Sequence, residues 1–229
     1  MVKKDATAPK ADSAAPPIKV LIVDDHPVVR EGLAMQIATQ PDMQVCGEAE
    51  SATAALALLD STQPDVAIID ISLKDDNGID LIRRIKGRND AVRILVLSMY
   101  PESLFGERAL RAGAQGYIYK GEATGHLVDA IRAVLTGEVF VSAELAEKMS
   151  RIAAGAVPVE SSPIERLSVR ELQAFELMGQ GLNTESIASR MHVSPKTVET
   201  YRARIKEKLG LSNVTELVQR ATQWLLESK

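Results

Sequence analysis

Five short apolar runs, each followed by a stretch with helical spacing, constrain the fold of this chain more than any other feature of its sequence. Strands separated by helices pair in parallel, because two parallel neighbours need a crossover of a dozen or more residues between them. The repeated order of strand and helix therefore predicts a parallel β-sheet with helices on both faces. The apolar runs are Ile18–Val23, Met43–Gly47, Val66–Ile69, Val92–Leu97 and Gly116–Tyr119.

The rest of the chain divides into three parts outside this α/β pattern. Residues 1–17 are rich in Lys, Ala, Ser and Pro and lack the apolar stretch of a signal peptide, so we expect a disordered tail. Residues 138–163 combine a short helix, Ser142–Ile152, with a proline-containing run of small residues that is typical of a linker. We therefore expect an α/β domain over residues 18–137 and an all-α domain over residues 164–229.

Composition narrows the compartment and the partners. The single cysteine, Cys46, excludes an internal disulfide and fits a reducing compartment. No apolar run approaches the roughly 20 residues that span a membrane, so we expect a cytoplasmic protein with no membrane partner. From Pro163 onward the chain has 10 Lys and Arg against 8 Asp and Glu, whereas the part before it has 17 against 23. A mildly basic end on an acidic body points to nucleic acid as a partner of the C-terminal part.

Polar side chains follow four of the five predicted strands, at the point where each strand ends. Asp24 and Asp25 follow the first strand, Asp70 the third, Ser98 the fourth and Lys120 the fifth. The carboxyl ends of parallel strands meet at one rim of the sheet, where α/β proteins bind ligands. Clustered carboxylates need a cation, and Mg²⁺ prefers oxygen ligands of this kind. A carboxylate beside Mg²⁺ can accept a phosphoryl group, whose oxygens the lysine and the serine would then contact.

This arrangement resembles the receiver domain of two-component response regulators, whose fold is flavodoxin-like with five parallel strands. The resemblance implies that Asp70 accepts phosphate from a sensor histidine kinase. It also implies that Asp25, Asp70 and the backbone carbonyl of Ser72 ligate Mg²⁺, while Asp24 supports the metal through a water molecule. Tyr117, in the fifth strand, matches the switch aromatic of the family.

The sequence departs from the usual receiver pattern at two points. Gly121 follows the lysine, where receivers often have proline, and the loop Ser72–Gly78 is rather acidic. We expect these departures to change the lifetime of the phosphate. Single residues of the site also have simpler explanations: an Asp pair is often part of a loop, and Tyr117 is equally well explained as a half-buried aromatic side chain. His26, beside the acidic pair, is expected to begin a helix rather than to bind a metal.

The C-terminal part carries the start and stop signals of short helices. Ser168 and Glu171 form a capping-box pattern before an apolar stripe. Ser194 and Pro195 begin a later helix that runs to Leu209. Two short helices joined by a tight turn, with the second facing outward and basic, describe a helix-turn-helix whose second helix fits the major groove of DNA. A purely structural bundle is the simpler alternative.

This part of the chain resembles the LuxR-type DNA-binding domain, which makes the whole chain similar to response regulators of the NarL/FixJ family. The matching segments are Leu167-Ser168-x-Arg170-Glu171, Gly181-Leu182-Asn183-x-Glu185-x-Ile187-Ala188, Ser194-x-Lys196-Thr197-Val198-x-Thr200-Tyr201 and Lys208-Leu209-Gly210-Leu211. Double-stranded DNA is the implied partner, and the expected contacts to bases and phosphates are Lys196, Thr197, Glu199, Thr200, Tyr201, Arg202, Arg204, Lys206 and Lys208. A fourth helix pairs two subunits in the family, here through Val214, Leu217, Val218, Ala221 and Leu225.

Three functions are open at this point. We favour a switch that is not an enzyme: phosphate on Asp70 draws Ser98 and Lys120 inward and frees the helix-turn-helix, which the unphosphorylated receiver can cover in the family, to bind promoter DNA as a homodimer. A phosphatase of the haloacid dehalogenase class also uses a strand-end Asp with Mg²⁺, but it needs a second Asp where this chain has Ser72. The third possibility is a regulator that works through protein contacts without phosphate.

Overall fold

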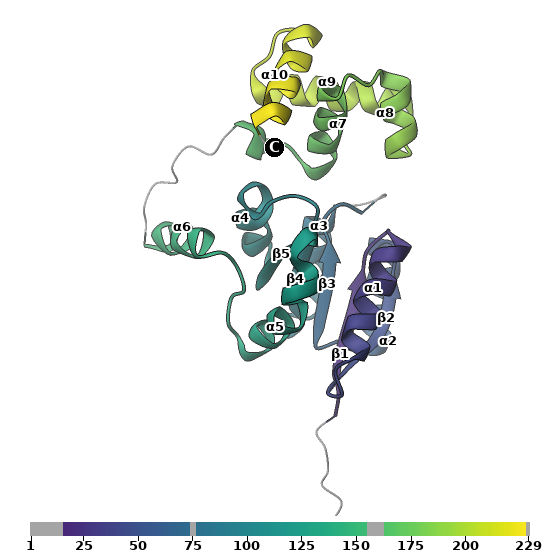
Figure 1. The fold of residues 1–229 in the computed structure, drawn as a ribbon, viewed down its shortest axis with the longest axis vertical. Coiled ribbons are helices and arrows are strands. Elements are labelled where there is room, and N and C mark those ends of the chain that lie inside the picture. The colour runs from purple at the N-terminus through teal and green to yellow at the C-terminus, as the bar shows by residue number, and fades with distance from the viewer. Residues whose placement is uncertain (1–15, 74–76, 155–162, 228–229) are drawn as a thin grey trace, which may run out of the picture.

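The computed structural model describes residues 16–73, 77–154 and 163–227, which form an α/β unit and a helical unit (Figure 1). The helical unit lies at the carboxyl end of the strands (Figure 1). Nearly all of the predicted tail, the acidic centre of the loop after Asp70 and most of the predicted linker lie outside the described residues.

The sheet of the α/β unit has five strands in the order β2-β1-β3-β4-β5, and all neighbours pair in parallel. The chain first winds outward from β1 to β2 and then returns to β3, so the carboxyl ends of β1 and β3 flank the point where ligands bind in such sheets. Every residue of β3 is buried, as the unbroken apolar run predicts. The strands are β1 (Ile18–Val23), β2 (Met43–Ala49), β3 (Val66–Asp70), β4 (Arg93–Ser98) and β5 (Gly116–Tyr119).

Helices cover both faces of the sheet because alternate side chains of each strand point to opposite faces. On β1, Val20 and Ile22 join the core beneath α1 and α5, whereas Leu21 and Val23 join the core beneath α2, α3 and α4. This arrangement confirms the predicted flavodoxin-like fold class. The helices are α1 (Pro27–Ala38), α2 (Ala52–Thr62), α3 (Gly78–Arg88), α4 (Glu102–Ala112) and α5 (Ala123–Thr136), with a 3₁₀ turn, η1 (Lys120–Glu122), before α5.

The segment after α5 packs against the α/β unit. The carbonyl of Phe140 accepts a hydrogen bond from the N–H of Tyr117 at 2.9 Å, beside the edge strand β5. α6 (Ala143–Ala153) then packs on α4, with Leu145 buried between them. A Cβ atom at Gly106 of α4 would lie 2.5 Å from Cδ2 of Leu145, so this close approach depends on glycine.

The helical unit is built around α7, which contacts the three helices that follow it. Its start is the predicted capping box: the hydroxyl of Ser168 accepts from the N–H of Glu171, whose carboxylate accepts from the N–H of Ser168. Ser194 caps the later helix in the same way, and Gly210 ends it in the left-handed conformation. The elements are η2 (Pro163–Arg166), α7 (Val169–Gly179), α8 (Thr184–Met191), α9 (Pro195–Leu209) and α10 (Val214–Glu227).

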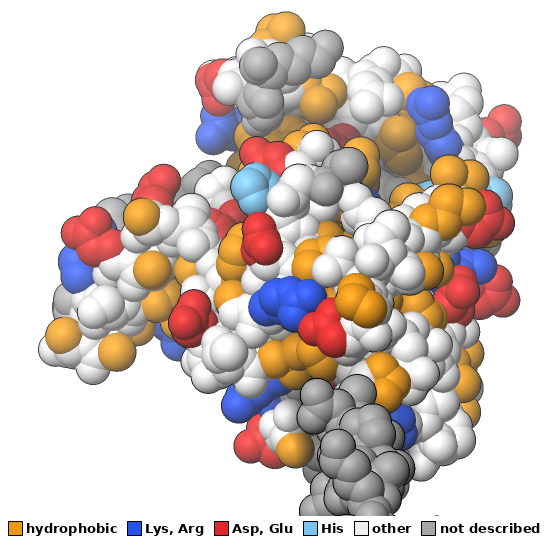
Figure 2. Space-filling view, turned by 60° about the horizontal axis from the view of Figure 1, so that its bottom comes forward, with side chains coloured by type: hydrophobic (Ala, Val, Ile, Leu, Met, Phe, Trp, Pro, Cys, Tyr) orange, Lys and Arg blue, Asp and Glu red, His pale blue; other side chains and the backbone are white. Residues whose placement is uncertain are grey.

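The surface carries charges of both signs. On the face shown in Figure 2, acidic and basic side chains are interspersed rather than gathered into one patch of a single sign. A search of the described residues finds no helix with the length and apolar character needed to cross a membrane.

Candidate functional site

Three carboxylates and one amine meet at the carboxyl rim of the sheet. Nζ of Lys120 lies 2.6 Å from Oδ2 of Asp24 and 2.7 Å from Oδ2 of Asp70. Asp25 lies beside them, and all three acidic residues are buried. The rim predicted from the sequence is therefore present: strand ends that are 96 and 50 positions apart along the chain from Lys120 place their charged groups within hydrogen-bond distance.

Burial and charge compete at this cluster. Burial raises the pKa of Asp70 above its ordinary value, and the opposing effect of Lys120 does not cancel this rise. Burial acts to lower the pKa of Lys120, but the neighbouring Asp70 and Asp24 outweigh it, so the amine is held firmly in its charged form. The net charge of three ionised carboxylates and one ammonium is negative, which leaves the rim ready for a further cation.

The acidic rim fits a divalent ion. Asp24, Asp25, His26 and Asp70 each offer one ligand atom, and these atoms all lie within 4.8 Å of one another. Within the part of the chain that the structure describes, the buried atom Oδ1 of Asp25 has no hydrogen-bond partner. A buried, ionised oxygen without a donor is costly unless a cation approaches it. Carboxylate oxygens are also the ligands that Mg²⁺ prefers.

A glycine next to the acceptor loop was not identified from the sequence as a functional residue. A Cβ atom at Gly78 would lie 2.4 Å from the carbonyl oxygen of Asp70 and 2.4 Å from Cα of Ile71. Both neighbours are backbone atoms, so a side chain at this position would have to displace the acceptor loop itself. The N–H of Ser72 donates to Oδ1 of Asp70 at 2.8 Å and fixes the carboxylate from the same loop.

The predicted hydroxyl and switch residues form a second chain of contacts. Ser98 is fully buried, and its Oγ accepts a hydrogen bond from the N–H of Tyr100 at 3.0 Å. The hydroxyl of Tyr117, which points inward, donates to the carbonyl of Tyr100 at 2.8 Å. The backbone of Tyr100 is thus held from two sides by the side chains that the sequence assigned to phosphate sensing.

The first turns of α9 present the predicted DNA-reading side chains to solvent. Lys196, Glu199, Thr200 and Arg204 are exposed, and Thr197, Tyr201, Arg202 and Lys206 are partly exposed. The inward face of the helix is filled by Val198 and Ile205, as the helical spacing predicts. α8 and α9 pack together in the manner of a helix-turn-helix.

Ion pairs within the helical unit already engage two of the basic residues expected to meet phosphates. Arg202 lies 2.9 Å from Glu199, which also accepts from the hydroxyl of Thr184 on α8. Lys208 lies 2.6 Å from Glu171, a buried residue of α7. Arg204 and Lys206 have no such ion pair among the described residues, and they offer the simplest phosphate contacts.

The apolar stripe of α10 faces α7 in this structure. Leu217 and Ala221 are fully buried, and a Cβ atom at Gly179 of α7 would lie 2.6 Å from Cδ1 of Leu225. These side chains therefore stabilise the helical unit itself. Val214 and Val218 keep part of their surface exposed and are the members of the predicted set with most freedom to meet a second copy.

The two units contact each other through α7 and the turn before it. Nη1 of Arg108, on α4, donates to the carbonyl of Leu167 at 2.6 Å. Nη2 of Arg170, on α7, donates to the carbonyl of Leu73, which follows the acceptor loop, at 2.6 Å. Sequence patterns gave no signal for these contacts, because each joins an arginine to a backbone carbonyl in a distant segment.

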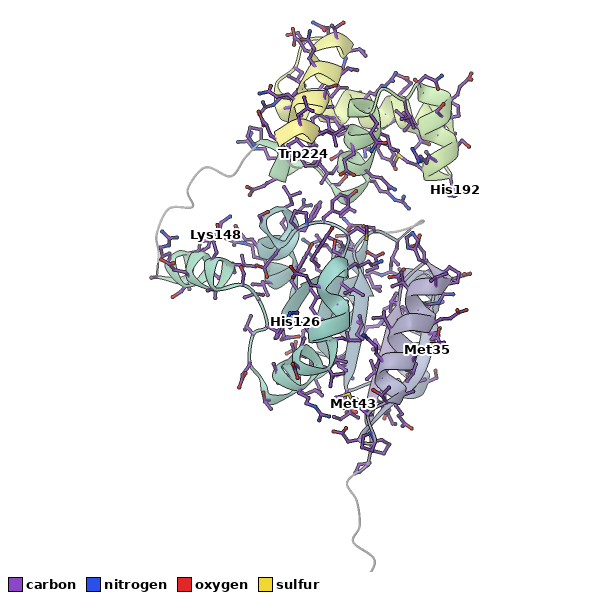
Figure 3. The ribbon with its side chains drawn as sticks, in the orientation of Figure 1. Met35, Met43, His126, Lys148, His192 and Trp224 are labelled. Carbon is purple, nitrogen blue, oxygen red and sulfur yellow. The ribbon has the colours of Figure 1, made fainter. Side chains whose placement is uncertain are left out.

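A hollow of about 970 Å³ opens beside this contact and is lined by both units, including Tyr100 and Glu176. Trp224 of α10 lines it too and lies on the side of the helical unit that faces the α/β unit (Figure 3). The exposed Lys196, Glu199 and Thr200 show that the α/β unit does not cover the start of α9. This differs from the expectation that the receiver hides the DNA-reading helix, because the contact is made through α7 instead.

The fold, the acidic rim and the helix-turn-helix together define a class of protein. Residues 20–132 match the family model "Response regulator receiver domain". Residues 165–221 match the family model "Bacterial regulatory proteins, luxR family". The chain therefore belongs to the response regulators of the NarL/FixJ type, which join a receiver domain to a LuxR-type DNA-binding domain.

Similar proteins span nearly the whole chain. The response regulator GacA of Pseudomonas syringae pv. syringae is 34% identical over 87% of this chain and 93% of its own length. The transcriptional regulatory protein UhpA of Escherichia coli is 35% identical over 89% of this chain and 97% of its own length. Among solved structures, RcsB of Salmonella enterica bound to a promoter in the presence of the phosphomimetic BeF₃⁻ superposes with a TM-score of 0.58 at 28% identity, covering 90% of this chain and 98% of that one.

Proposed function

We propose that this protein is a cytoplasmic transcriptional regulator whose binding to promoter DNA is controlled by phosphorylation of Asp70. The observation that carries the proposal is the convergence of Asp24, Asp25, Asp70 and Lys120 at the carboxyl rim of the sheet. A solvated loop does not hold three carboxylates and an amine buried together, because such a cluster is costly without a function. The family membership supports a sensor histidine kinase as the phosphate donor.

The transfer can be followed at the atoms of Asp70. A carboxylate oxygen of Asp70 attacks the phosphorus of a kinase phosphohistidine, a P–O bond forms, and the P–N bond breaks with its electron pair going to the imidazole. Lys120 already contacts Oδ2 of Asp70 and can follow the negative charge onto the phosphoryl oxygens. Mg²⁺ held by Asp25, Asp70 and the carbonyl of Ser72, with Asp24 acting through water, would supply neutralisation of the transferring group.

Phosphate on Asp70 can act on the DNA-binding domain through the two receiver segments that α7 contacts. Ser98 Oγ is expected to turn toward the phosphoryl group, which weakens its hydrogen bond to the N–H of Tyr100. The loop after Asp70 carries Leu73, whose carbonyl holds Arg170. Both connections to α7 therefore start within three residues of a phosphate-binding group, so a small movement at the rim reaches the domain contact directly.

The start of α9 is the proposed DNA-reading surface. Lys196, Thr197, Glu199, Thr200 and Tyr201 would lie in the major groove, and Arg202, Arg204 and Lys206 would meet phosphates. Glu199 repels phosphate and accepts hydrogen bonds, so it would favour a donor such as the amino group of cytosine. A homodimer on paired half-sites fits the family, with the exposed parts of Val214 and Val218 available for pairing.

Labelling with radioactive acetyl phosphate tests this function. The wild-type chain is expected to take up one phosphoryl group in the presence of Mg²⁺, and Asp70→Asn to take up none. Asp60→Asn is the matched control, because Asp60 is an exposed aspartate of α2 far from the rim. Equal labelling of wild type and Asp70→Asn would refute the acceptor assignment. Absence of labelling in every variant would favour a regulator that works through protein contacts alone.

A multiple-turnover assay separates the switch from a phosphatase. Ser72 stands where a haloacid dehalogenase phosphatase needs its second aspartate, and a hydroxyl group is a poor general acid or base. We therefore expect a slow, single discharge of the aspartyl phosphate with no preference for a phosphomonoester substrate. Sustained hydrolysis of such a substrate that Asp70→Asn abolishes would instead identify an enzyme.

A further inference from the structure

The side chain of His26 lies against the acidic rim instead of capping the helix that it begins. His26 is the residue before α1, yet its side chain makes no capping hydrogen bond to that helix. Its Nδ1 atom lies 2.7 Å from Oδ1 of Asp25 and 3.1 Å from Oδ1 of Asp24. The backbone N–H of His26 donates to Oδ1 of Asp24 at 2.8 Å. The expectation that this histidine merely starts a helix therefore accounts for its backbone and not for its imidazole.

The contact between His26 and Asp25 has the spacing of two ligand atoms around one ion. Although Nδ1 and Oδ1 are 2.7 Å apart, Oδ1 of Asp25 has no hydrogen-bond partner among the described residues. Two ligand atoms at right angles around an ion, each about 2.1 Å from it, are about 3.0 Å apart. The distances of 2.7 and 3.1 Å from Nδ1 to the two carboxylates bracket this value.

We propose that His26 is a direct ligand of the rim metal and that the site accepts a divalent transition metal ion such as Mn²⁺ as well as Mg²⁺. This proposal rests on the acidic site of the proposed function and adds a nitrogen ligand to it. Asp24, Asp25, His26 and Asp70 form one group whose ligand atoms lie within 4.8 Å of one another. Mg²⁺ favours oxygen ligands alone, whereas imidazole nitrogen suits transition metals, so His26 selects between the two kinds of ion.

The position of the ring supports this role. The side chain of His26 is 58% exposed, whereas those of Asp24 and Asp25 are 2% and 5% exposed. The imidazole therefore forms the outer wall of a buried carboxylate cluster and can reach an ion that enters from solvent. Lys120 contacts the other oxygen, Oδ2, of Asp24, so it leaves the Oδ1 atoms of the acidic pair to His26 and the metal.

Pulsed electron paramagnetic resonance of Mn²⁺ bound to the full chain tests the proposal. Wild type is expected to show coupling of the metal to a ligand ¹⁴N nucleus, and His26→Ala is expected to lose it. His126→Asn and His192→Asn are the controls, because these remaining histidines lie on α5 and at the end of α8 (Figure 3). Both controls should keep the coupling. Bound Mn²⁺ without nitrogen coupling in the wild type would overturn the proposal.

Affinities of the same variants distinguish a ligand from a positioning residue. His26→Ala is expected to weaken Mn²⁺ binding about tenfold and Mg²⁺ binding much less. His26→Asn can still donate a hydrogen bond to the carboxylates, so full recovery of Mn²⁺ affinity in this variant would show that the histidine only orients them. Mg²⁺-dependent labelling of Asp70 by acetyl phosphate is measured alongside. Labelling without nitrogen coupling refutes the His26 ligand alone, whereas loss of all metal binding in the wild type refutes the site itself.

Discussion

The phenol of Tyr100 in the receiver domain donates a hydrogen bond to Oε2 of Glu176 in the DNA-binding domain, at 3.2 Å. This bond joins the segment that follows Ser98 to the middle of α7, and both side chains are largely buried where the domains meet. It gives the contact between the domains a dependence on pH and on single side chains that can be measured.

We expect the domains to separate more readily as the pH rises. Burial raises the pKa of Glu176, and the hydrogen bond from Tyr100 only partly opposes this. Docking is therefore fully favoured below the ordinary pKa of about 4.3 and weakens as the pH rises through the higher value of the docked state. Fluorescence of Trp224, the single tryptophan of the chain, reports the change because this residue lines the hollow between the domains. Glu176→Gln should remove the dependence, and an unchanged pH profile in that variant would contradict the assignment.

Removal of the small residue beside the acceptor loop should disturb that loop specifically. Gly78→Ala places a methyl group 2.4 Å from the backbone of Asp70, so we expect a loss of about 1–3 kcal/mol in the free energy of unfolding and slower phosphate uptake. Gly32→Ala is the matched control in α1, where nothing lies within 4 Å. It should stabilise the protein by about 0.5–1 kcal/mol because alanine favours the helix. Urea unfolding and acetyl phosphate labelling measure both effects; equal behaviour of the two variants would argue against a steric role for Gly78.

The amine at the rim should be replaceable by a metal ion. Lys120→Met leaves the buried carboxylates without their counter-charge, and we expect a loss of about 3 kcal/mol in stability. Added Mg²⁺ should then raise the melting temperature more in the variant than in the wild type, because the ion no longer shares Asp24 and Asp70 with an ammonium group. Thermal unfolding with and without Mg²⁺ decides the point. A variant that is stable and indifferent to Mg²⁺ would be incompatible with a functional acidic rim.

The ion pair between Glu171 and Lys208 should stabilise the DNA-binding domain at neutral pH and fail in acid. Burial acts to raise the pKa of Glu171, but hydrogen bonds from Lys208 and Ser168 lower it below its ordinary value. Its contribution is therefore present above the pKa of the unfolded chain and is lost as the pH falls through the lower folded value. Lys208→Met should cost about 1–2 kcal/mol at pH 7, since the lysine is partly exposed. Urea unfolding between pH 7 and pH 4 should show the difference shrinking in acid; a constant difference would exclude this explanation.

The basic side chains of α9 should differ in their effect on DNA affinity. Arg204 is exposed and has no ion pair among the described residues, so Arg204→Ala is expected to reduce the slope of log affinity against log salt by about 1. Lys196→Ala combined with Thr200→Ala should weaken specific binding more than non-specific binding. Arg151→Ala on α6, outside the DNA-binding domain, is the control. Titration of operator DNA at several salt concentrations measures these effects, and an unchanged slope for Arg204→Ala would place the DNA elsewhere.

The sequence was a good guide to the elements that local patterns specify. Polar residues at strand ends predicted the rim, because parallel strands bring their carboxyl ends together whatever their separation along the chain. The turn into α5 was less predictable: the helix begins at Ala123 rather than near His126, after a 3₁₀ turn that starts at Lys120. The start signals of that helix are weak, since its cap residue Glu122 makes no side-chain hydrogen bond.

Other features depend on contacts that no local pattern encodes. An apolar stripe on α10 predicts that one face is buried, but only the packing of α7 shows that Leu217 and Ala221 are buried within their own domain. The space around Gly78 and the bonds from Arg108 and Arg170 to backbone carbonyls likewise appear only when distant segments meet. His26 looked like a helix start, because a sequence does not show which way an imidazole turns.

The exposed start of α9 has a consequence for where control is exerted. A helix that solvent can reach while the receiver holds α7 is able to slide and hop along DNA by charge attraction in either state of the protein. Search for the operator then needs no signal, and the signal acts on how long two copies stay together once they have found adjacent half-sites. A regulator of this design would be present on the chromosome before stimulation and would respond by a change in residence time.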